Sequence, residues 1–149
     1  MGFPLRTVIV IHTTSPASNA QTDALFSLNI RNPAQPGKFI SLKFPTLSHN
    51  ERERGRTDEY RFDVIEMGLG VADIDAFKAK NSFSMTIHSG DAWLPSAFWV
   101  IGLPNSGGAE LLVGHPFWPG DQWFSTNTSD AAGQAKPTRF LDENLEVPF

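Results

Sequence analysis

The sequence predicts an all-β fold, a β-sandwich, in a single domain within its 149 residues. Two segments, residues 25–30 and 83–88, alternate apolar and polar side chains with the period of a half-buried strand. Turn signals rich in Gly, Pro and Asn separate further short apolar runs, and almost no stretch has the periodicity of a helix. Seven or eight short strands spaced in this way are typical of a β-sandwich.

The order of the strands follows from local patterns. Val8–Ile11 is a β-branched run that indicates a buried first strand, and Phe39–Phe44 is ended by Pro45, which cannot donate to a sheet ladder. The other expected elements are strands at Leu25–Ile30, Tyr60–Val64 and Phe83–His88, a hairpin of Phe98–Leu103 with Leu111–Val113, and one or two helical turns within Val71–Phe77.

Two of the expected strands begin with the same Thr-Asp pair. Gly55 permits a backbone bend, and Thr57 and Asp58 can hydrogen-bond backbone groups where the next strand begins. Thr22 and Asp23 stand before the earlier strand in the same way. We interpret these residues as structural.

Composition excludes several classes of protein. The net charge is −4 and no basic run exceeds two residues, so the basic surface needed for nucleic acid is missing. The absence of cysteine removes disulfides, thiolate catalysis and cysteine-ligated zinc. The first ten residues carry one short apolar run, so we expect neither a signal peptide nor a transmembrane segment, and we expect a soluble, cytoplasmic protein.

The residues of common enzyme sites lack the required spacing. Ser106 lies in Asn-Ser-Gly-Gly rather than in the Gly-x-Ser-x-Gly of a hydrolase elbow. No helical zinc pair is formed by the four histidines, His12, His49, His88 and His115. We expect no enzyme activity and no cofactor, although a Ser/His/Asp site assembled across the fold stays open.

Three separated motifs resemble the PLAT domain, a family shared by lipoxygenases, some lipases, polycystins and a bacterial toxin. The motifs are Thr22-Asp23-Ala24, the segment from Glu53 to Tyr60, and Trp118-Pro119-Gly120-Asp121-Gln122-Trp123-Phe124. The resemblance covers about Val8 to Asn127 and implies two sheets of roughly four antiparallel strands. It assigns a structural role to Thr22, Asp23, Arg54, Gly55, Thr57, Asp58 and Trp123. We expect the domain to occupy residues 1–127, followed by a mobile tail at 128–149 in which Phe140 and Leu141 can dock back.

Trp93 and Leu94 are the first candidates for binding. The loop that holds them is similar to a family loop with an apolar residue at its tip, and a tryptophan ring suits the membrane interface. The alternative is that Trp93 folds back onto a sheet edge. Trp118 is a further candidate.

Arg52 and Arg56, with Arg54 between them, could meet lipid phosphates. Acidic residues alternate with these arginines, so a solvated, salt-bridged turn is the alternative that we favour.

Calcium binding, which the resemblance implies for some family members, is not expected to be tight. Pro16 stands where those members place an acid, and it offers no side-chain oxygen. Asp91 and Asn19 remain as candidate ligands of a weak site.

The sequence therefore favours a non-catalytic module that attaches to a lipid or membrane surface, or to a separately encoded protein that acts on lipids. One alternative is a carbohydrate-binding sandwich that uses Trp93 and Trp118 as stacking platforms. The other is a small hydrolase.

Overall fold

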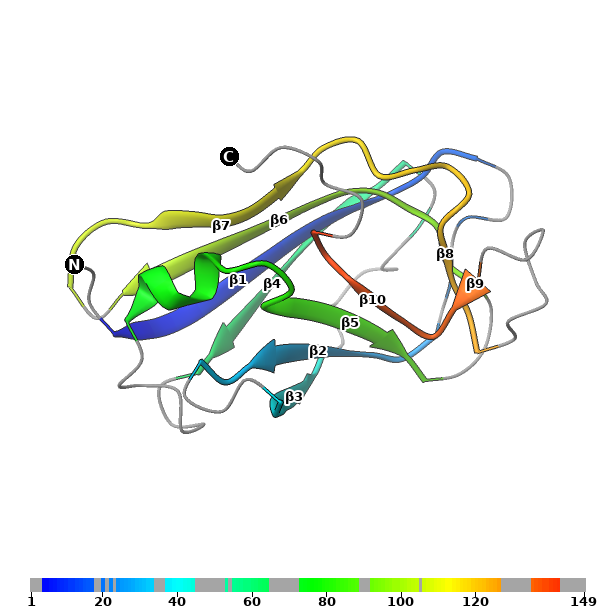
Figure 1. Ribbon diagram of the computed structural model, residues 1–149. Coiled ribbons are helices and arrows are strands. Elements are labelled where there is room, and N and C mark those ends of the chain that lie inside the picture. Colours follow the sequence, from blue (N-terminus) through cyan, green and yellow to red (C-terminus); the bar gives the residue numbers. More distant parts are fainter. Residues whose placement is uncertain are drawn as a thin grey trace.

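The computed structural model describes residues 4–17, 20, 22, 24–33, 37–44, 53, 55–64, 73–88, 92–104, 106–126 and 135–142. Within them the chain is an all-β sandwich of two four-stranded antiparallel sheets, with strand orders β4-β1-β6-β7 and β10-β5-β2-β3 (Figure 1). The predicted fold class is therefore confirmed.

The first sheet is built around β1 (Leu5–Thr14), which pairs with β4 (Thr57–Asp63) on one side and β6 (Pro95–Pro104) on the other. β7 (Glu110–His115) pairs with β6 and completes the predicted hairpin. Val10 lies opposite both Tyr60 and Val100, and all three are buried. The β-branched run at Val8–Ile11 thus marks a strand that is paired on both sides, as its composition indicates.

The second sheet consists of β2 (Phe26–Arg31), β3 (Phe39–Lys43), β5 (Phe83–Ile87) and β10 (Thr138–Phe140). Leu28 of β2 lies opposite Leu42 of β3 and Met85 of β5, and these side chains face the first sheet. The intervening residues of the strands point away from the core, as the period of two requires.

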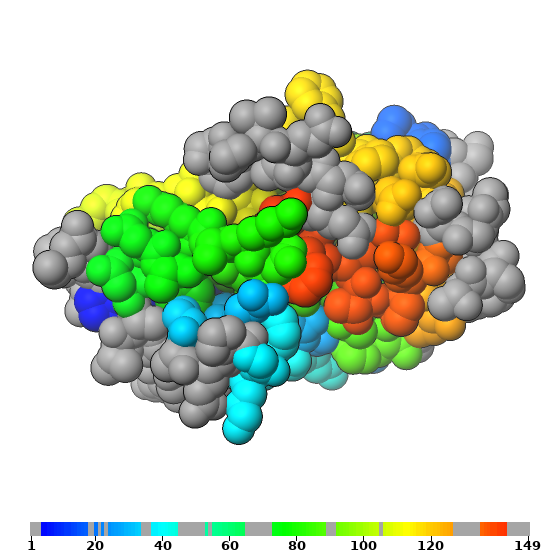
Figure 2. All heavy atoms as spheres, in the orientation of Figure 1, coloured from blue at the N-terminus to red at the C-terminus, as the bar shows by residue number. Residues whose placement is uncertain are grey.

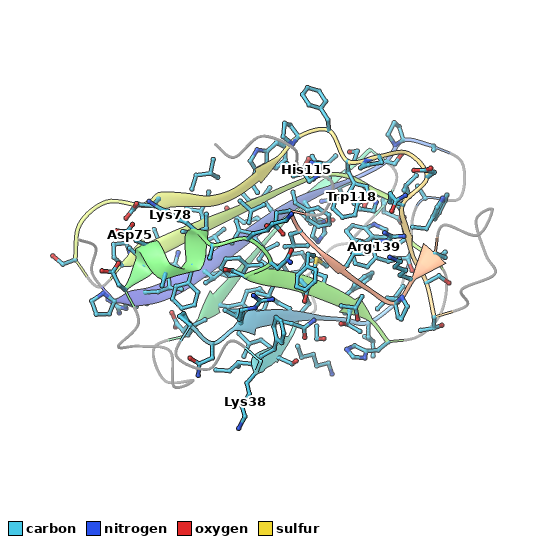
Figure 3. All side chains as sticks on the ribbon, viewed as in Figure 1. Lys38, Asp75, Lys78, His115, Trp118 and Arg139 are labelled. Carbon is cyan, nitrogen blue, oxygen red and sulfur yellow. The ribbon has the colours of Figure 1, made fainter. Side chains whose placement is uncertain are left out.

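A short 3-10 helix, η2 (Ile74–Lys78), packs beside the sandwich at the end opposite Trp118 (Figure 3). Asp73 caps it by accepting a hydrogen bond from the amide of Asp75 at 2.8 Å. Ile74 reaches the backbone of Gly102, where an added Cβ would lie 3.0 Å from the Ile74 methyl group. The predicted helical turns are confirmed, and no helix of the described residues is long and apolar enough to cross a membrane.

Residues 135–142 belong to the sandwich, so the domain boundary expected at residue 127 is wrong. β8 (Trp123–Phe124) pairs in parallel with β9 (Ala135–Lys136), and β10 then pairs with β5. Arg139 is buried and donates to the carbonyl oxygen of Trp123 at 3.0 Å, while Leu141 is fully buried. An inward-pointing arginine breaks the apolar alternation by which a strand is recognised, so the sequence pattern does not indicate a strand at Thr138–Phe140. The rest of the expected tail lies outside the described residues.

Candidate functional site

Four connections meet at one end of the first sheet, where β1 and β7 finish and β4 and β6 begin (Figure 1). The amide of Gly55 donates to the carbonyl of Thr14 at 3.0 Å, and the amide of Ser15 donates to that of Leu94 at 2.9 Å. The amide of Trp118 donates to the carbonyl of Ser96 at 3.0 Å. We call residues 15–17, 55–56, 92–94 and 116–122 the loop end.

Trp93 and Leu94 lie in the core, so the expectation that they form an exposed loop tip is wrong. The side chain of Trp93 is 0% exposed, and its indole N–H donates to the hydroxyl of Thr14 at 2.9 Å. Its backbone exchanges two hydrogen bonds of 2.8 Å with Phe124, which fixes Trp93 as a one-residue strand. Because the indole finds its partner inside the protein, burial satisfies both its apolar ring and its N–H. The alternative, in which Trp93 folds back, describes the structure.

Trp118 is also buried and cannot serve as an exposed stacking platform. Its ring packs edge-on against Phe98 at 5.0 Å, and its indole N–H donates to the carbonyl of Gln122 at 2.9 Å. Trp123 is partly buried against the same core. The two rings on which the carbohydrate alternative depended are therefore both inside the protein.

Phe117 is the aromatic residue that the loop end exposes, with 87% of its surface accessible. It follows β7 in a segment that runs along the edge of the molecule, coloured yellow to orange in Figure 2. Pro116 and Pro119 frame the segment and restrict its backbone, and the buried ring of Trp118 anchors it. The sequence analysis named Trp118 as a binding candidate and did not name Phe117. Adjacent side chains of an extended segment point in opposite directions, so a buried Trp118 predicts an exposed Phe117.

Arg56 lies at the loop end but is held by an acid. Its Nε atom is 3.3 Å from a carboxylate oxygen of Asp58, whose side chain is fully buried while Arg56 remains accessible. The Arg56 amide donates to the carbonyl of Glu53 at 2.9 Å, closing a turn in which Gly55 has a φ of 73°. For Arg56 alone, this arrangement is a salt-bridged turn. Arg52 and Arg54 lie outside the described residues.

The remaining motif residues have local structural contacts. The hydroxyl of Thr22, which is buried, accepts a hydrogen bond from the amide of Ala24 at 3.1 Å. Thr57 and Thr13 share a hydrogen bond of 2.8 Å between facing strands. The contact of Thr22 fits the expected capping of a backbone amide before a strand, whereas that of Thr57 joins two side chains across the sheet. Asp23 lies outside the described residues.

No group of three metal-ligating side chains occurs among the described residues. Asp91 and Asn19, the candidate calcium ligands, lie outside that part of the chain. His12 and His115 are buried and pack against aromatic rings, His12 at 4.9 Å from Trp93 and His115 at 5.2 Å from Trp118.

Comparison with solved structures shows a PLAT-like fold. Alpha toxin from Clostridium absonum superposes with a TM-score of 0.56 at 14% identity, over 76% of this chain and 32% of the toxin. Clostridium perfringens alpha-toxin from avian strain SWCP gives a TM-score of 0.55 at 17% identity, over 78% of this chain and 29% of the toxin. Coral 8R-lipoxygenase gives 0.48 at 16% identity, over 70% of this chain and 14% of the enzyme. This chain thus corresponds to less than a third of the length of either toxin.

No family model matches the sequence, and no curated protein sequence matches it.

Proposed function

We propose that the chain is a non-catalytic module that attaches reversibly to a lipid surface through the loop end, with Phe117 as the inserted residue. The observation that carries the proposal is the 87% exposure of Phe117 on a segment whose neighbouring residue is anchored in the core. An exposed aromatic ring on a constrained backbone loses little conformational freedom on binding. Attachment to lipid is also supported by the PLAT-like fold. The sequence motifs resemble the same family, which occurs in proteins that act on lipids.

The charge of the loop end favours a zwitterionic surface over an anionic one. Arg56 is paired with Asp58, and the chain as a whole carries a net charge of −4. Long-range attraction to an anionic membrane is therefore weak. Attachment would rest on apolar burial, and a phenylalanine side chain transferred fully from water contributes about 1.5–3 kcal/mol.

The decisive experiment compares Phe117→Ser with Leu111→Ser in sedimentation with phosphatidylcholine vesicles. Leu111 is a matched control because it is 43% exposed on β7, near the opposite end of the strand from the loop end. We expect Phe117→Ser to weaken binding by roughly 10- to 100-fold, because it removes the inserted ring, and Leu111→Ser to bind as the wild type does. Equal binding by wild type and Phe117→Ser, or no vesicle binding by the wild type, would reject the attachment that we propose.

A protein that acts on lipids is the other partner that the exposed ring could contact. Wild type that ignores vesicles but retains such a protein, with retention lost on Phe117→Ser, would assign the loop end to protein binding.

A further inference from the structure

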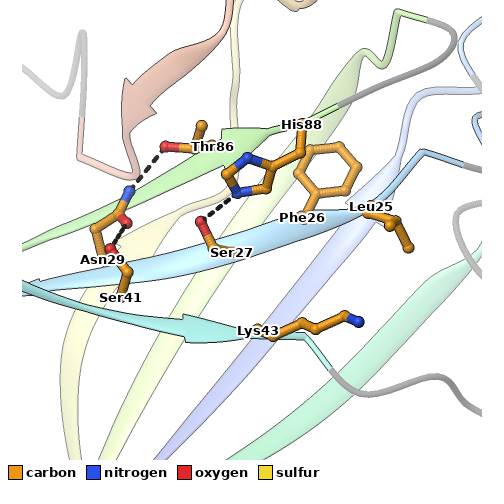
Figure 4. Close-up of a pocket in the computed structure, with 8 residues that line it drawn as sticks. All are labelled: Leu25, Phe26, Ser27, Asn29, Ser41, Lys43, Thr86 and His88. Carbon is orange, nitrogen blue, oxygen red and sulfur yellow. Dashed lines mark hydrogen bonds between the residues drawn. The ribbon is translucent and has the colours of Figure 1, made fainter.

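A groove of about 500 Å³ lies on the outer face of the second sheet (Figure 4). Phe117, in contrast, follows β7 of the first sheet. Six polar residues line it: Ser27, Asn29, Ser41, Lys43, Thr86 and His88. Leu25 and Phe26 contribute apolar surface at one end. The volume is in the range of small-molecule sites.

The hollow arises because small polar side chains occupy the middle of the sheet. Asn29 on β2 lies opposite Ser41 on β3 and Ser84 on β5. In the next row, Ser27 lies between Lys43 and Thr86. The short side chains of Ser27, Ser41 and Thr86, beside the longer Lys43, leave a depression along the sheet.

Two aromatic rings lie beyond the lining of the groove, where β3 begins and β10 ends, and Phe39 precedes Ser41 by two residues on the same face of β3. The rings of Phe39 and Phe140 lie 6.3 Å apart, although β3 and β10 are the two edge strands, so the rings reach toward each other across the central strands. Phe39 is 40% exposed and has the guanidinium of Arg31 at 5.4 Å from its centroid. An accessible aromatic ring therefore stands next to the groove, on the same face of β3 as Ser41.

The donors and acceptors of the hydrogen bonds at the bottom of the groove are defined by Asn29. The Asn29 amide nitrogen donates to Ser84 at 3.1 Å and to Thr86 at 2.9 Å, which uses both of its hydrogens. The Asn29 oxygen accepts the single hydroxyl hydrogen of Ser41 at 2.7 Å. The oxygen of Ser41 therefore offers only acceptor positions to a ligand.

Lys43 provides a charged donor two residues after Ser41 on β3. Across the groove, His88 forms a hydrogen bond of 2.8 Å with the hydroxyl of Ser27 (Figure 4). No carboxylate is among the described residues that line the groove. A ligand must therefore supply donors toward Ser41 and acceptors toward Lys43.

This pattern selects one class of ligand. A phosphate dianion supplies acceptors alone, and an acyl chain supplies neither donors nor acceptors. An extended peptide needs free backbone groups of a strand, but β2 and β5 are central strands whose backbones are already paired. Ring hydroxyls both donate and accept, and the apolar face of a sugar ring can pack on an aromatic side chain.

We propose that the groove binds a saccharide ring that carries one carboxylate, as a uronic acid does. The ring hydroxyls donate to Ser41, and the carboxylate pairs with Lys43. The exposed ring of Phe39, next to Ser41 on the same face of β3, is the aromatic surface within reach of its apolar face. This site is separate from Phe117 and does not depend on lipid attachment.

The test is a nuclear magnetic resonance titration of the full ¹⁵N-labelled chain with glucuronate and with glucose. We expect glucuronate to shift the amide signals of the groove with a Kd on the order of 1 mM, since a ligand of this size makes few contacts. Glucose should bind roughly tenfold more weakly, because it lacks the charge-assisted bond to Lys43.

Three variants locate the site. Asn29→Ala should weaken the binding of both sugars by roughly tenfold, because it removes the amide whose hydrogen bonds orient Ser41 and Thr86. Lys43→Gln should remove only the preference for glucuronate. Thr138→Ala is the matched control, since Thr138 ends the same hydrogen-bond chain at 2.7 Å from Thr86 but does not line the groove. It should bind both sugars as the wild type does. Amide spectra of the variants without ligand confirm that each is folded.

A second arm identifies the source of the sugar. Vesicles that contain a glucuronosyl lipid are compared with plain phosphatidylcholine vesicles, using the wild type and Phe117→Ser. Binding of the free sugar, or of the glucuronosyl vesicles by Phe117→Ser in excess of plain vesicles, supports the groove. No shift with either sugar together with no preference for glucuronosyl vesicles overturns it, as does an Asn29→Ala variant that binds like the wild type.

Discussion

Replacing Trp93 with alanine tests whether Trp93 and Leu94, the first binding candidates of the sequence analysis, belong to the core or to the surface. The indole ring is fully buried, with ring centroids 4.9 Å from His12, 5.1 Å from Phe26 and 5.4 Å from Phe124. Removing a buried aromatic side chain of this kind costs about 3–5 kcal/mol of unfolding free energy. Because a domain has roughly 5–15 kcal/mol in total, Trp93→Ala should lose about a fifth of the stability or more.

Thermal and urea unfolding measure this loss. At roughly 2–4 °C per kcal/mol for a chain of this length, the midpoint of Trp93→Ala should fall by about 6–20 °C. Trp93→Phe keeps most of the ring but leaves the Thr14 hydroxyl without its donor, so it should cost about 1–3 kcal/mol. Phe117→Ala is the control, because an exposed ring should change the unfolding free energy by less than about 0.5 kcal/mol. If Trp93→Ala melts within a degree or two of the wild type, the packing described for this residue is incorrect.

Two other predictions concern the domain boundary and calcium. A chain ended at residue 127 should be less stable than one ended at 142 by more than about 5 kcal/mol, because it loses β10 and the buried side chains of Arg139 and Leu141. Equal urea midpoints for the two chains would show that the domain ends at residue 127. Millimolar calcium should move the melting midpoint by less than about 1–2 °C, because the described residues hold no cluster of metal ligands. A large rise of the midpoint would indicate a calcium site completed by residues such as Asp91.

The strands could be predicted where burial follows the backbone period. Residues 83–88 alternate in sequence, and β5 covers Phe83–Ile87 with Phe83, Met85 and Ile87 in the core. The hairpin of β6 and β7 was marked by an Asn-Ser-Gly-Gly turn between two apolar runs. In each case the information is local, so the sequence alone carries it.

The side chains of the loop end could not be placed in the same way, because their burial depends on residues far along the chain. The partner of the Trp93 indole is Thr14, and the backbone of Trp93 pairs with Phe124. Neither contact leaves a local signal, and a tryptophan beside a glycine and a proline looks exposed. Arg139 shows the opposite case, since its burial depends on the carbonyl of Trp123, which only the folded chain brings near. The groove on the second sheet likewise joins residues of three strands.

The position of β10 has a consequence for biosynthesis. Until residues 138–140 leave the ribosome, β5 is an open edge of the second sheet, with a row of unpaired backbone groups that can attract a strand from another nascent chain. The first sheet has a similar delay, because β1 waits for β6 and Val10 must find Val100. Strand exchange between chains is therefore most favoured in the interval before β10 pairs with β5, when the other strands can already associate but one edge of the second sheet is still open.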